Sequence, residues 1–285
     1  MNDSSAISQR LQQLAKHSPN LKLIVRFYET ILPLLETADL HVQPVDLDAE
    51  QAKEKLAKGF PLLQNVALTL DYGEAHRIMI KLCGALEQAA DSGLNTFKKL
   101  KRALEEEKID IVELMAHVIV NDQESVLSLA LPLGIDGGRV RTLTSYVLRS
   151  ALYAWRRQLS PLIEEAAWNK PCCPICGAMP AFAELQGHHL QKHLRCNRCG
   201  ADWPARRVHC LYCGNENHRT LGVLFEDARH DTARLEICEQ CKGYIKVIVT
   251  FSPTPPEQLP ILDLETIYLN YIAEERGYWM NGLRL

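Results

Sequence analysis

Four cysteine pairs with identical spacing lie between residues 173 and 241, and they constrain the fold more than any other feature of the chain. Cysteines at positions i and i+3 of a tight turn direct both sulfurs toward one point, so two such turns supply the four thiolates of a tetrahedral metal site. Four turns therefore predict two four-cysteine metal sites. The pairs are Cys173/Cys176, Cys196/Cys199, Cys210/Cys213 and Cys238/Cys241.

The residues that follow the turns agree with this interpretation. Gly177, Gly200 and Gly214 follow the second cysteine of the first three turns, at a position that usually needs a positive φ angle. The fourth turn differs, because Lys242 occupies that position and Gly243 comes one residue later.

Other roles for the cysteines fit the pattern less well. Structural disulfides need an oxidising compartment, and the first residues show no basic region followed by an apolar run, so we expect no secretory signal. A thioredoxin-like redox pair would need one CxxC at the start of a helix in a βαβ unit. Cys83 lies in an apolar helical run and is expected to be a buried, inert thiol. Cys172 is interpreted as a bystander, with an alternate ligand or a reactive thiol as the other possibilities.

The separations along the chain predict which turns combine. Nineteen residues separate Cys176 from Cys196 and 24 separate Cys213 from Cys238, enough for a hairpin in each case, whereas only ten lie between Cys199 and Cys210. We therefore pair the first turn with the second and the third with the fourth. This gives two consecutive ribbons, over about 171–205 and 206–250.

The region before the cysteines has a different character. Apolar residues recur there at helical spacing and predict helices over 21–35, 62–90, 109–120 and 140–167, the second of them ended by Ser92-Gly93. The whole chain of 285 residues, 47% of them hydrophobic, suits one large or two medium domains. We expect an all-helical domain over 1–168.

From residue 171 onward, short alternating runs predict strands instead. They cover 182–185, 190–194, 220–225, 234–237 and 244–249. A proline-rich linker follows at 252–256, and a last helix is expected from near Asp263 to Glu275 or Arg276, ended by Gly277. The predicted fold class is α+β, with a metal-binding domain over 169–285 that ends in a helix.

Charge and motifs exclude several function classes. The net charge is −3, and residues 169–285 contain 13 Lys and Arg against 13 Asp and Glu. Four thiolates with a divalent ion add about −2 per site, so the cationic excess that nucleic-acid binding needs is missing. No apolar run is long enough to span a bilayer. A closed four-cysteine site leaves no open position for hydrolytic catalysis, and neither paired catalytic carboxylates nor a phosphate-binding loop is evident, so we do not expect an enzyme.

The flanking residues resemble the formate dehydrogenase accessory protein family, FdhE. The resemblance is strong over the C-terminal region and rests on class and length alone over the helical one. It lies in the order of the four turns and in the segments Cys173-Pro174-Ile175-Cys176-Gly177-Ala178-Met179-Pro180, Leu194-Arg195-Cys196-Asn197-Arg198-Cys199 with Trp203, Arg207-Val208-His209-Cys210 to Cys213, Cys238-Glu239-Gln240-Cys241, Tyr244-Ile245-Lys246 and Leu262-Asp263.

The resemblance implies a function that spacing and composition do not show. It implies iron as the metal of the two rubredoxin-like ribbons, with one mononuclear site in each, in a cytoplasmic bacterial protein. It also implies a role in the assembly or activation of respiratory formate dehydrogenase, through contact with the catalytic subunit of that enzyme. Zinc remains an alternative metal, because four thiolates accept either ion.

Three classes of function therefore stay open. The first is an assembly factor without a substrate of its own. The second is a rubredoxin-like one-electron redox protein, since iron held by four thiolates cycles between two oxidation states. The third, a nucleic-acid-binding zinc ribbon, is disfavoured by the charge balance.

The third cysteine turn suggests a partner surface. The two residues between the ligands are expected at the tip of the turn, and here they are the apolar Leu211 and the aromatic Tyr212. Trp203 and Arg206 are near in sequence, and aromatic residues and arginine are favoured anchors in interfaces. The alternative is that Leu211 packs on the neighbouring ribbon or on the helical domain.

Overall fold

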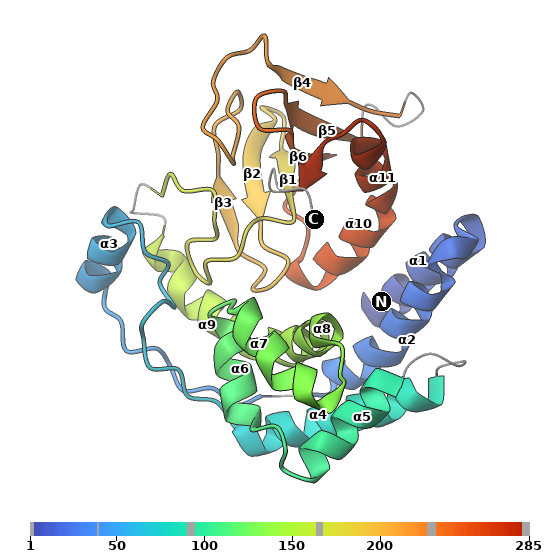
Figure 1. The fold of residues 1–285 in the computed structure, drawn as a ribbon. Helices are drawn as coiled ribbons and strands as arrows, with labels where there is room; N and C mark the ends of the chain where they lie inside the picture. Colours follow the sequence, from blue (N-terminus) through green and yellow to red (C-terminus); the bar gives the residue numbers. More distant parts are fainter. Residues whose placement is uncertain (1–2, 39, 90–94, 164–167, 227–231, 281–285) are drawn as a thin grey trace. The chain divides into compact units, whose positions relative to one another are not determined.

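The computed structural model describes residues 3–38, 40–89, 95–163, 168–226 and 232–280 (Figure 1). The chain divides into two compact units, the first formed by residues 1–53 and 62–162 and the second by residues 54–61 and 163–285. Residues 164–167, beside the predicted domain boundary at 168, lie outside the described part. That boundary stays a prediction.

The first unit is helical, as its apolar periodicity predicts. Asp110, Asp122 and Asp136 begin three of its helices, where each carboxylate accepts a hydrogen bond from a backbone N–H group of the first turn. The helices are α1 (Asp3–His17), α2 (Lys22–Glu36), α3 (Ala49–Ala57), whose end belongs to the second unit, α4 (Tyr72–Ala89), α5 (Asn95–Glu105), α6 (Ile111–Ile119), α7 (Gln123–Ala130), α8 (Gly137–Val147) and α9 (Arg149–Leu159), with 3₁₀ turns at Pro19–Leu21, Leu131–Leu133 and Ser160–Leu162.

Two predicted helices have different bounds in the structure. The helix expected from residue 62 begins only at Tyr72, because the segment before it is extended: Leu70 forms an antiparallel bridge with Val42, and Asn65 takes a left-handed φ of 53°. Asp71 then caps the helix by accepting a hydrogen bond from the Glu74 backbone N–H at 2.8 Å. The helix expected over 140–167 is divided into α8 and α9 at Leu148. The expected stop at Ser92-Gly93 lies outside the described residues.

The core of the first unit contains the isolated cysteine. Cys83 on α4 has no exposed surface and lies among apolar residues of the same helix such as Met79 and Leu82. Burial raises the pKa of its thiol to about 12, so this cysteine is protonated and inert at neutral pH. The prediction of a buried Cys83 is confirmed.

The second unit is built on one seven-stranded sheet in the order β3-β2-β1-β6-β5-β4, with β7 paired to β6 (Figure 1). All pairs along this order are antiparallel except β1 with β6, where Ala183 lies opposite Val247 in a parallel register. The strands are β1 (Phe182–Gln186), β2 (Gln191–Arg195), β3 (Asp202–Pro204), β4 (Leu221–Leu224), β5 (Ala233–Cys238), β6 (Gly243–Thr250) and β7 (Trp279–Met280).

The parallel pairing of β1 with β6 joins the two predicted ribbons. Strands β1 to β3 come from the first ribbon and β4 to β6 from the second, so the ribbons share a sheet and are not separate modules. The first six residues of β6 are all buried, as expected for a strand in the middle of a sheet that is covered on both faces. The α+β fold class, with helices followed by two cysteine ribbons and C-terminal helices, is confirmed.

Two short helices, α10 (Leu259–Glu265) and α11 (Ile267–Glu275), take the place of the single C-terminal helix that we predicted. Thr266 lies between them. Leu269 and Ala273 of α11 pack against Leu235 of β5, and Leu259 of α10 packs against Phe182 of β1. These helices therefore cover one face of the sheet. Among the described residues, no helix combines the length and the apolar character that crossing a lipid bilayer requires.

Candidate metal centres

The first cysteine group combines the first two turns, as the spacing predicts. The sulfurs of Cys173 and Cys199 are 3.5 Å apart, and those of Cys176 and Cys196 are also 3.5 Å apart. All four sulfurs lie within 4.8 Å of one another and all four residues are buried. A tetrahedral ion with metal–sulfur bonds of about 2.3 Å would separate its sulfurs by about 3.8 Å, so this group has the size of a four-thiolate site.

The second group has nearly the same dimensions. The Cys210 and Cys241 sulfurs are 3.6 Å apart, and the Cys213 and Cys238 sulfurs are 3.7 Å apart. These four sulfurs also lie within 4.8 Å of one another. Exposure separates the two groups, because Cys213 is exposed and Cys241 is half-buried in the second.

Backbone conformation explains how three of the turns bring their sulfurs together. Gly177, Gly200 and Gly214 have φ angles of 74°, 73° and 74°, in the left-handed region that favours glycine. Each of these glycines donates its N–H to the carbonyl of the first cysteine in its turn, at 2.9–3.0 Å. The expected positive φ at the three glycines is confirmed.

The fourth turn reaches the same shape with a lysine. Lys242 has a φ of 57°, and its ammonium group bonds to Glu239 and lies 5.1 Å from the centre of the Tyr278 ring. Gly243, one residue later, is needed for a different reason, because the ring of Tyr212 packs against it. A Cβ atom on Gly243 would come within 2.5 Å of that ring.

Tyr212 therefore connects the third turn to the fourth. Besides the contact with Gly243, its hydroxyl donates a hydrogen bond to the Tyr244 carbonyl at 2.9 Å. The Gly243 N–H in turn lies 3.4 Å from the Cys241 sulfur, as a donor. This aromatic residue is thus part of the packing that holds the second group together.

Asn215 is a residue of the second group that sequence analysis missed. Its amide lies 3.4 Å from the Cys238 sulfur and 2.8 Å from the Thr220 hydroxyl, as a donor to both. Its side-chain oxygen accepts the Asn217 N–H at 3.0 Å, which forms a turn typical of asparagine. An asparagine directly after Gly214 is the sequence signal from which this turn could have been predicted.

The thiols of the two groups have perturbed pKa values. Burial raises the pKa of Cys173 and Cys199 well above the usual range, whereas hydrogen bonds from neighbouring thiols, Cys173 first, hold the pKa of Cys176 well below it. Burial alone would raise the pKa of Cys238, but the Asn215 amide and backbone N–H groups outweigh it and lower the pKa to about 6. A bound metal ion requires the thiolate form of all its ligands, and these donors favour that form at Cys238.

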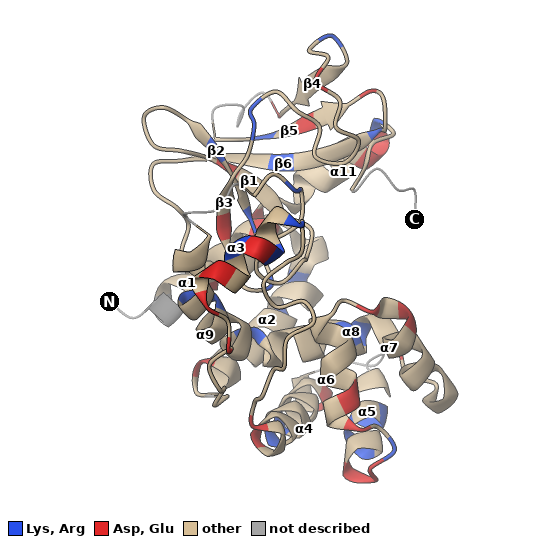
Figure 2. Ribbon diagram, turned by 90° about the vertical axis from the view of Figure 1, so that its left-hand side faces the viewer, with Lys and Arg blue, Asp and Glu red and all other residues tan. Residues whose placement is uncertain are grey.

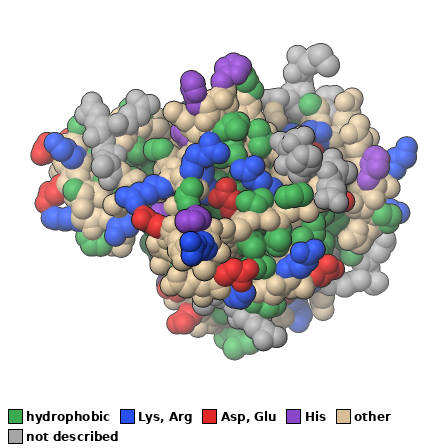
Figure 3. All heavy atoms as spheres, turned by 90° about the horizontal axis from the view of Figure 1, so that it is seen from above, with side chains coloured by type: hydrophobic (Ala, Val, Ile, Leu, Met, Phe, Trp, Pro, Cys, Tyr) green, Lys and Arg blue, Asp and Glu red, His purple; other side chains and the backbone are tan. Residues whose placement is uncertain are grey.

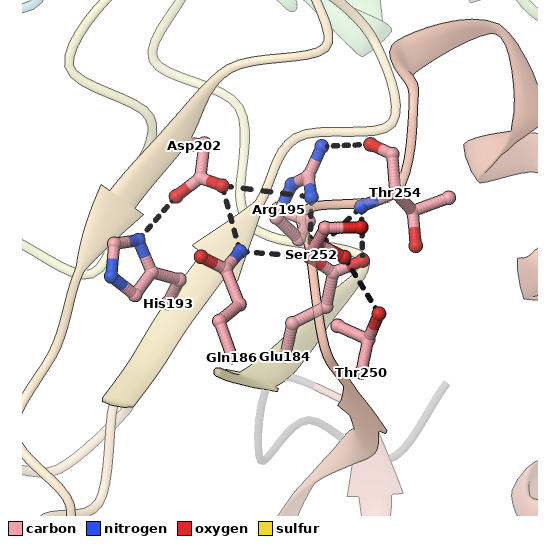
Figure 4. A network of polar contacts seen from close by, with 8 residues as sticks. All are labelled: Glu184, Gln186, His193, Arg195, Asp202, Thr250, Ser252 and Thr254. Atoms are coloured by element: carbon pink, nitrogen blue, oxygen red, sulfur yellow. Dashed lines mark hydrogen bonds and ion pairs between the residues drawn. The ribbon is translucent and has the colours of Figure 1, made fainter. Parts of the chain in front are cut away.

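A polar network braces the turn that carries Cys196 (Figure 4). The neighbouring Arg195 is 2% exposed, bonds to Glu184 of β1, and donates to the Thr254 carbonyl at 2.6 Å. Asp202 of β3 lies 3.6 Å from the same guanidinium and also bonds to His193. Burial alone would raise the pKa of Asp202, but hydrogen bonds from His193 and Gln186 and the charge of Arg195 lower it.

A second ion pair, in which the lysine is buried, links residues that the family resemblance had singled out separately. Lys246 of β6 is 1% exposed, and its ammonium lies 2.5 Å from a carboxylate oxygen of Asp263 on α10. The other carboxylate oxygen of Asp263 lies 3.4 Å from the Asn197 amide, in the second cysteine turn. This pair therefore ties α10 to the sheet and to the first cysteine group.

The remaining cysteine lies beside the first group. Cys172 is half-buried and belongs to neither group of four. Its carbonyl accepts a hydrogen bond from the Trp168 indole at 2.8 Å, and burial raises the pKa of its thiol. This environment agrees with its interpretation as a bystander.

The four residues predicted for the partner surface are placed differently. Trp203 is 1% exposed, because its position on β3 turns its side chain toward the interior of the second unit. It therefore has almost no surface that a partner could contact. Arg206 is exposed and pairs with Glu216 at 2.6 Å. Leu211 and Tyr212 are both half-buried rather than at an exposed tip, since Tyr212 folds back onto the fourth turn. Contact of these residues with a partner stays a prediction.

Comparisons with known proteins agree with the cysteine pattern. No protein-family model matches the chain. It is 25% identical over 281 residues to a protein FdhE homologue of Aquifex aeolicus, covering 94% of this chain and 90% of that protein. It is also 25% identical over 279 residues to protein FdhE of Escherichia coli O127:H6, covering 95% of this chain and 83% of that protein.

The chain is similar to FdhE proteins over nearly its whole length. The crystal structure of the FdhE protein from Pseudomonas aeruginosa has the same fold, with a TM-score of 0.64 at 20% identity, covering 98% of this chain and 93% of that one. Similarity to FdhE proteins thus extends over the helical unit as well as the cysteine-rich one. The resemblance inferred from the four turns is confirmed.

Proposed function

We propose that this chain is a cytoplasmic accessory protein of formate dehydrogenase, which acts in maturation or activation of the enzyme without catalysing a reaction. The observation that carries the proposal is the similarity to FdhE proteins over about 95% of the chain, together with two four-cysteine groups. The partner that follows from the family resemblance is the catalytic subunit of respiratory formate dehydrogenase.

The direct test is genetic complementation. In the native host, deletion of the gene is expected to abolish most respiratory formate dehydrogenase activity while the catalytic subunit is still synthesised. Wild-type protein supplied in trans should restore activity. Full formate dehydrogenase activity in the deletion strain would contradict the proposal.

The eight cysteines of the two groups are proposed as ligands of two mononuclear metal ions, preferably iron. The sulfur separations of 3.5–3.7 Å fit four-thiolate coordination. A bound ion would supply crosslinking of the turns, and in the case of iron also one-electron chemistry. The chain contributes the turns that aim the sulfurs and the Asn215 and Gly243 donors that stabilise thiolates.

Metal analysis and a visible spectrum of anaerobically purified protein from the native host distinguish the metals. Two equivalents of iron and the strong colour of ferric tetrathiolate are expected. Colourless protein with two equivalents of zinc would overturn the assignment of iron and leave the four-cysteine sites intact.

For the partner surface, Leu211 and Arg206 are the predicted residues that best allow a clean test. Leu211→Ser and Arg206→Ser are expected to weaken co-purification of the catalytic subunit while both metal ions are retained. Tyr212→Ser would be ambiguous, because Tyr212 packs against Gly243 and bonds to Tyr244. Undiminished co-purification by both metal-replete variants would remove Leu211 and Arg206 from the interface.

A one-electron redox protein is the second candidate function. The specific observation in its favour is the exposed ligand Cys213, since an exposed ligand brings a metal ion near the surface, where electrons can enter. Reversible bleaching of the iron spectrum by dithionite and air would support it. A nucleic-acid partner is disfavoured, because basic and acidic residues are interspersed along the chain (Figure 2).

A further inference from the structure

The strand β4 is an unprotected edge of the sheet. In the described part of the sheet it has a neighbour on one side only, namely β5. It lies in a run of five residues without charge or proline, over 221–225, in which Val223 and Phe225 are 46% and 48% exposed. An edge strand directs backbone N–H and C=O groups outward, where another strand can pair with them.

The opposite edge of the same sheet, formed by β3, has features that prevent pairing with another strand. Strand β3 spans three residues and contains both a charged residue, Asp202, and a proline, Pro204. Charge, proline and short length are the devices by which proteins prevent pairing at a sheet edge. Since β4 lacks the first two, the sheet is open to strand addition at β4 and closed to it at β3.

A cavity of about 310 Å³ lies beside β4. Its lining includes Leu221 and Val223 of β4, Ile245 of β6, and Arg207, Leu211 and Tyr212 of the preceding segment. This volume is at the lower end of the range for ligand-binding pockets. Alternate side chains of an added strand face the same side of a sheet, so a partner strand beside β4 would present an apolar side chain to this cavity.

Two arginines line the cavity and favour an acidic side chain on the partner. Arg207 is exposed, and Arg234 also lines the cavity. The carboxylate Glu236 is offset, because it bonds to the buried Lys192 and lies 3.9 Å from Arg234. In the view from above, Lys and Arg side chains lie among hydrophobic side chains, with Asp and Glu side chains also present (Figure 3).

The position of the acidic group follows from the exposure of Arg207. Its guanidinium is exposed at the cavity, where an acidic side chain of an added strand would be attracted to it.

We propose that the partner polypeptide docks on β4 as an added, extended strand, with an apolar side chain over the cavity and an acidic side chain against Arg207. Backbone hydrogen bonds supply affinity and the cavity supplies specificity in such strand additions. The inference rests on the proposed function, because the probe for the partner is the formate dehydrogenase catalytic subunit.

Binding of the full-length, metal-loaded protein to the purified catalytic subunit tests the docking site. Val223→Glu places a charge on the edge of β4, and Arg207→Glu reverses the charge at the rim. Each is expected to weaken binding by about tenfold or more, the loss typical of a residue that matters in an interface. Phe251→Glu and Arg219→Glu are matched controls, since Phe251 is 73% exposed and neither residue lines the cavity. Both controls should bind as wild type does.

Hydrogen exchange of the wild-type complex provides a readout that no substitution can disturb. Those backbone amides of residues 221–225 that point away from β5 should become protected when the subunit binds, whereas those of β3 should not change. Absence of protection at β4 overturns the proposal even if both glutamate variants bind poorly.

The possible outcomes distinguish failure of the docking site from failure of the proposed function. If wild type does not bind the catalytic subunit, the proposed function and this occupant both fail. If wild type binds and the two cavity variants bind equally well, the docking site alone is wrong. If Val223→Glu instead dissolves a homodimer and leaves subunit binding unchanged, β4 pairs with a second copy of the chain and the proposed partner is excluded.

Discussion

The two cysteine groups share their spacing and their sulfur geometry but differ in their surroundings. All four cysteines of the first group are buried, whereas Cys213 of the second is exposed and Cys241 is half-buried. The residues between the ligands differ in the same way. Pro174 and Ile175 in the first turn are buried, while Glu239 and Gln240 in the fourth are exposed.

This difference in burial indicates that the two cysteine groups have different roles. Arg195 and Asn197 connect the second turn to β1, β3 and α10, so loss of the first group would affect most of the sheet. The second group is held by contacts close to itself, namely Tyr212 against Gly243 and Asn215 against Cys238. The first group is therefore expected to support the fold, and the second to be the accessible one.

The largest effect is expected from loss of a buried ligand. Cys196→Ser should release the first metal ion and unfold the second unit, since a structural four-thiolate ion contributes on the order of 10 kcal/mol to folding. Limited proteolysis should then digest residues 163–285 and spare the helices of the first unit. Cys213→Ser, at the exposed ligand, should leave the sheet folded. Equal protease resistance of the two variants would contradict the inference that only the first group supports the fold of the second unit.

A smaller loss is expected from breaking the ion pair beside the first group. Arg195→Met leaves Glu184 buried and unpaired, which typically costs about 3–5 kcal/mol. Thermal unfolding of the metal-loaded protein measures the loss. The Arg206–Glu216 pair is the control, because its side chains are 71% and 60% exposed, and Arg206→Met should change stability little. Similar losses in both variants would show that burial of the network does not matter.

The difference in burial between the two cysteine groups is expected to produce a difference in their rates of metal release. A chromophoric chelator should remove the ion of the second group about tenfold faster than that of the first, equivalent to about 1.4 kcal/mol in the barrier. The fast phase should disappear in Cys213→Ser if that variant no longer retains the second ion. Release of both ions in one phase would contradict the inference from exposure.

A stability change of comparable size is expected at the residue after the second cysteine, which is lysine in the fourth turn and glycine in the other three. Gly214→Lys is expected to destabilise the second unit by about 1–2 kcal/mol, because lysine is strained at a φ of 74°. A Cβ atom there would meet nothing closer than His209 at 3.9 Å, so steric overlap does not add to the loss. Lys242→Gly should change stability less, since relief of strain is offset by loss of the contacts to Glu239 and Tyr278. Chemical denaturation followed by tryptophan fluorescence measures both.

Features that depend on local spacing could be predicted from the amino-acid sequence. The i, i+3 cysteines and their glycines predicted the turns, the left-handed φ angles and the pairing of first with second and third with fourth. Apolar periodicity separated helices from strands, although it missed Asp71 as the start of α4 and the break between α10 and α11 at Thr266. A turn or an amphipathic helix is encoded within a few consecutive residues, so a single sequence suffices to find it.

How the strands, helices and cysteine groups combine could not be predicted in this way. The parallel pairing of β1 with β6, the ion pair of Lys246 with Asp263 and the unequal burial of the two cysteine groups join residues far apart in the chain. Burial depends on what packs against a residue from distant segments, and cysteine spacing contains no information about that. For this reason Trp203, predicted near a partner surface, is a core residue, and the open edge at β4 became visible only when the strands were placed in order.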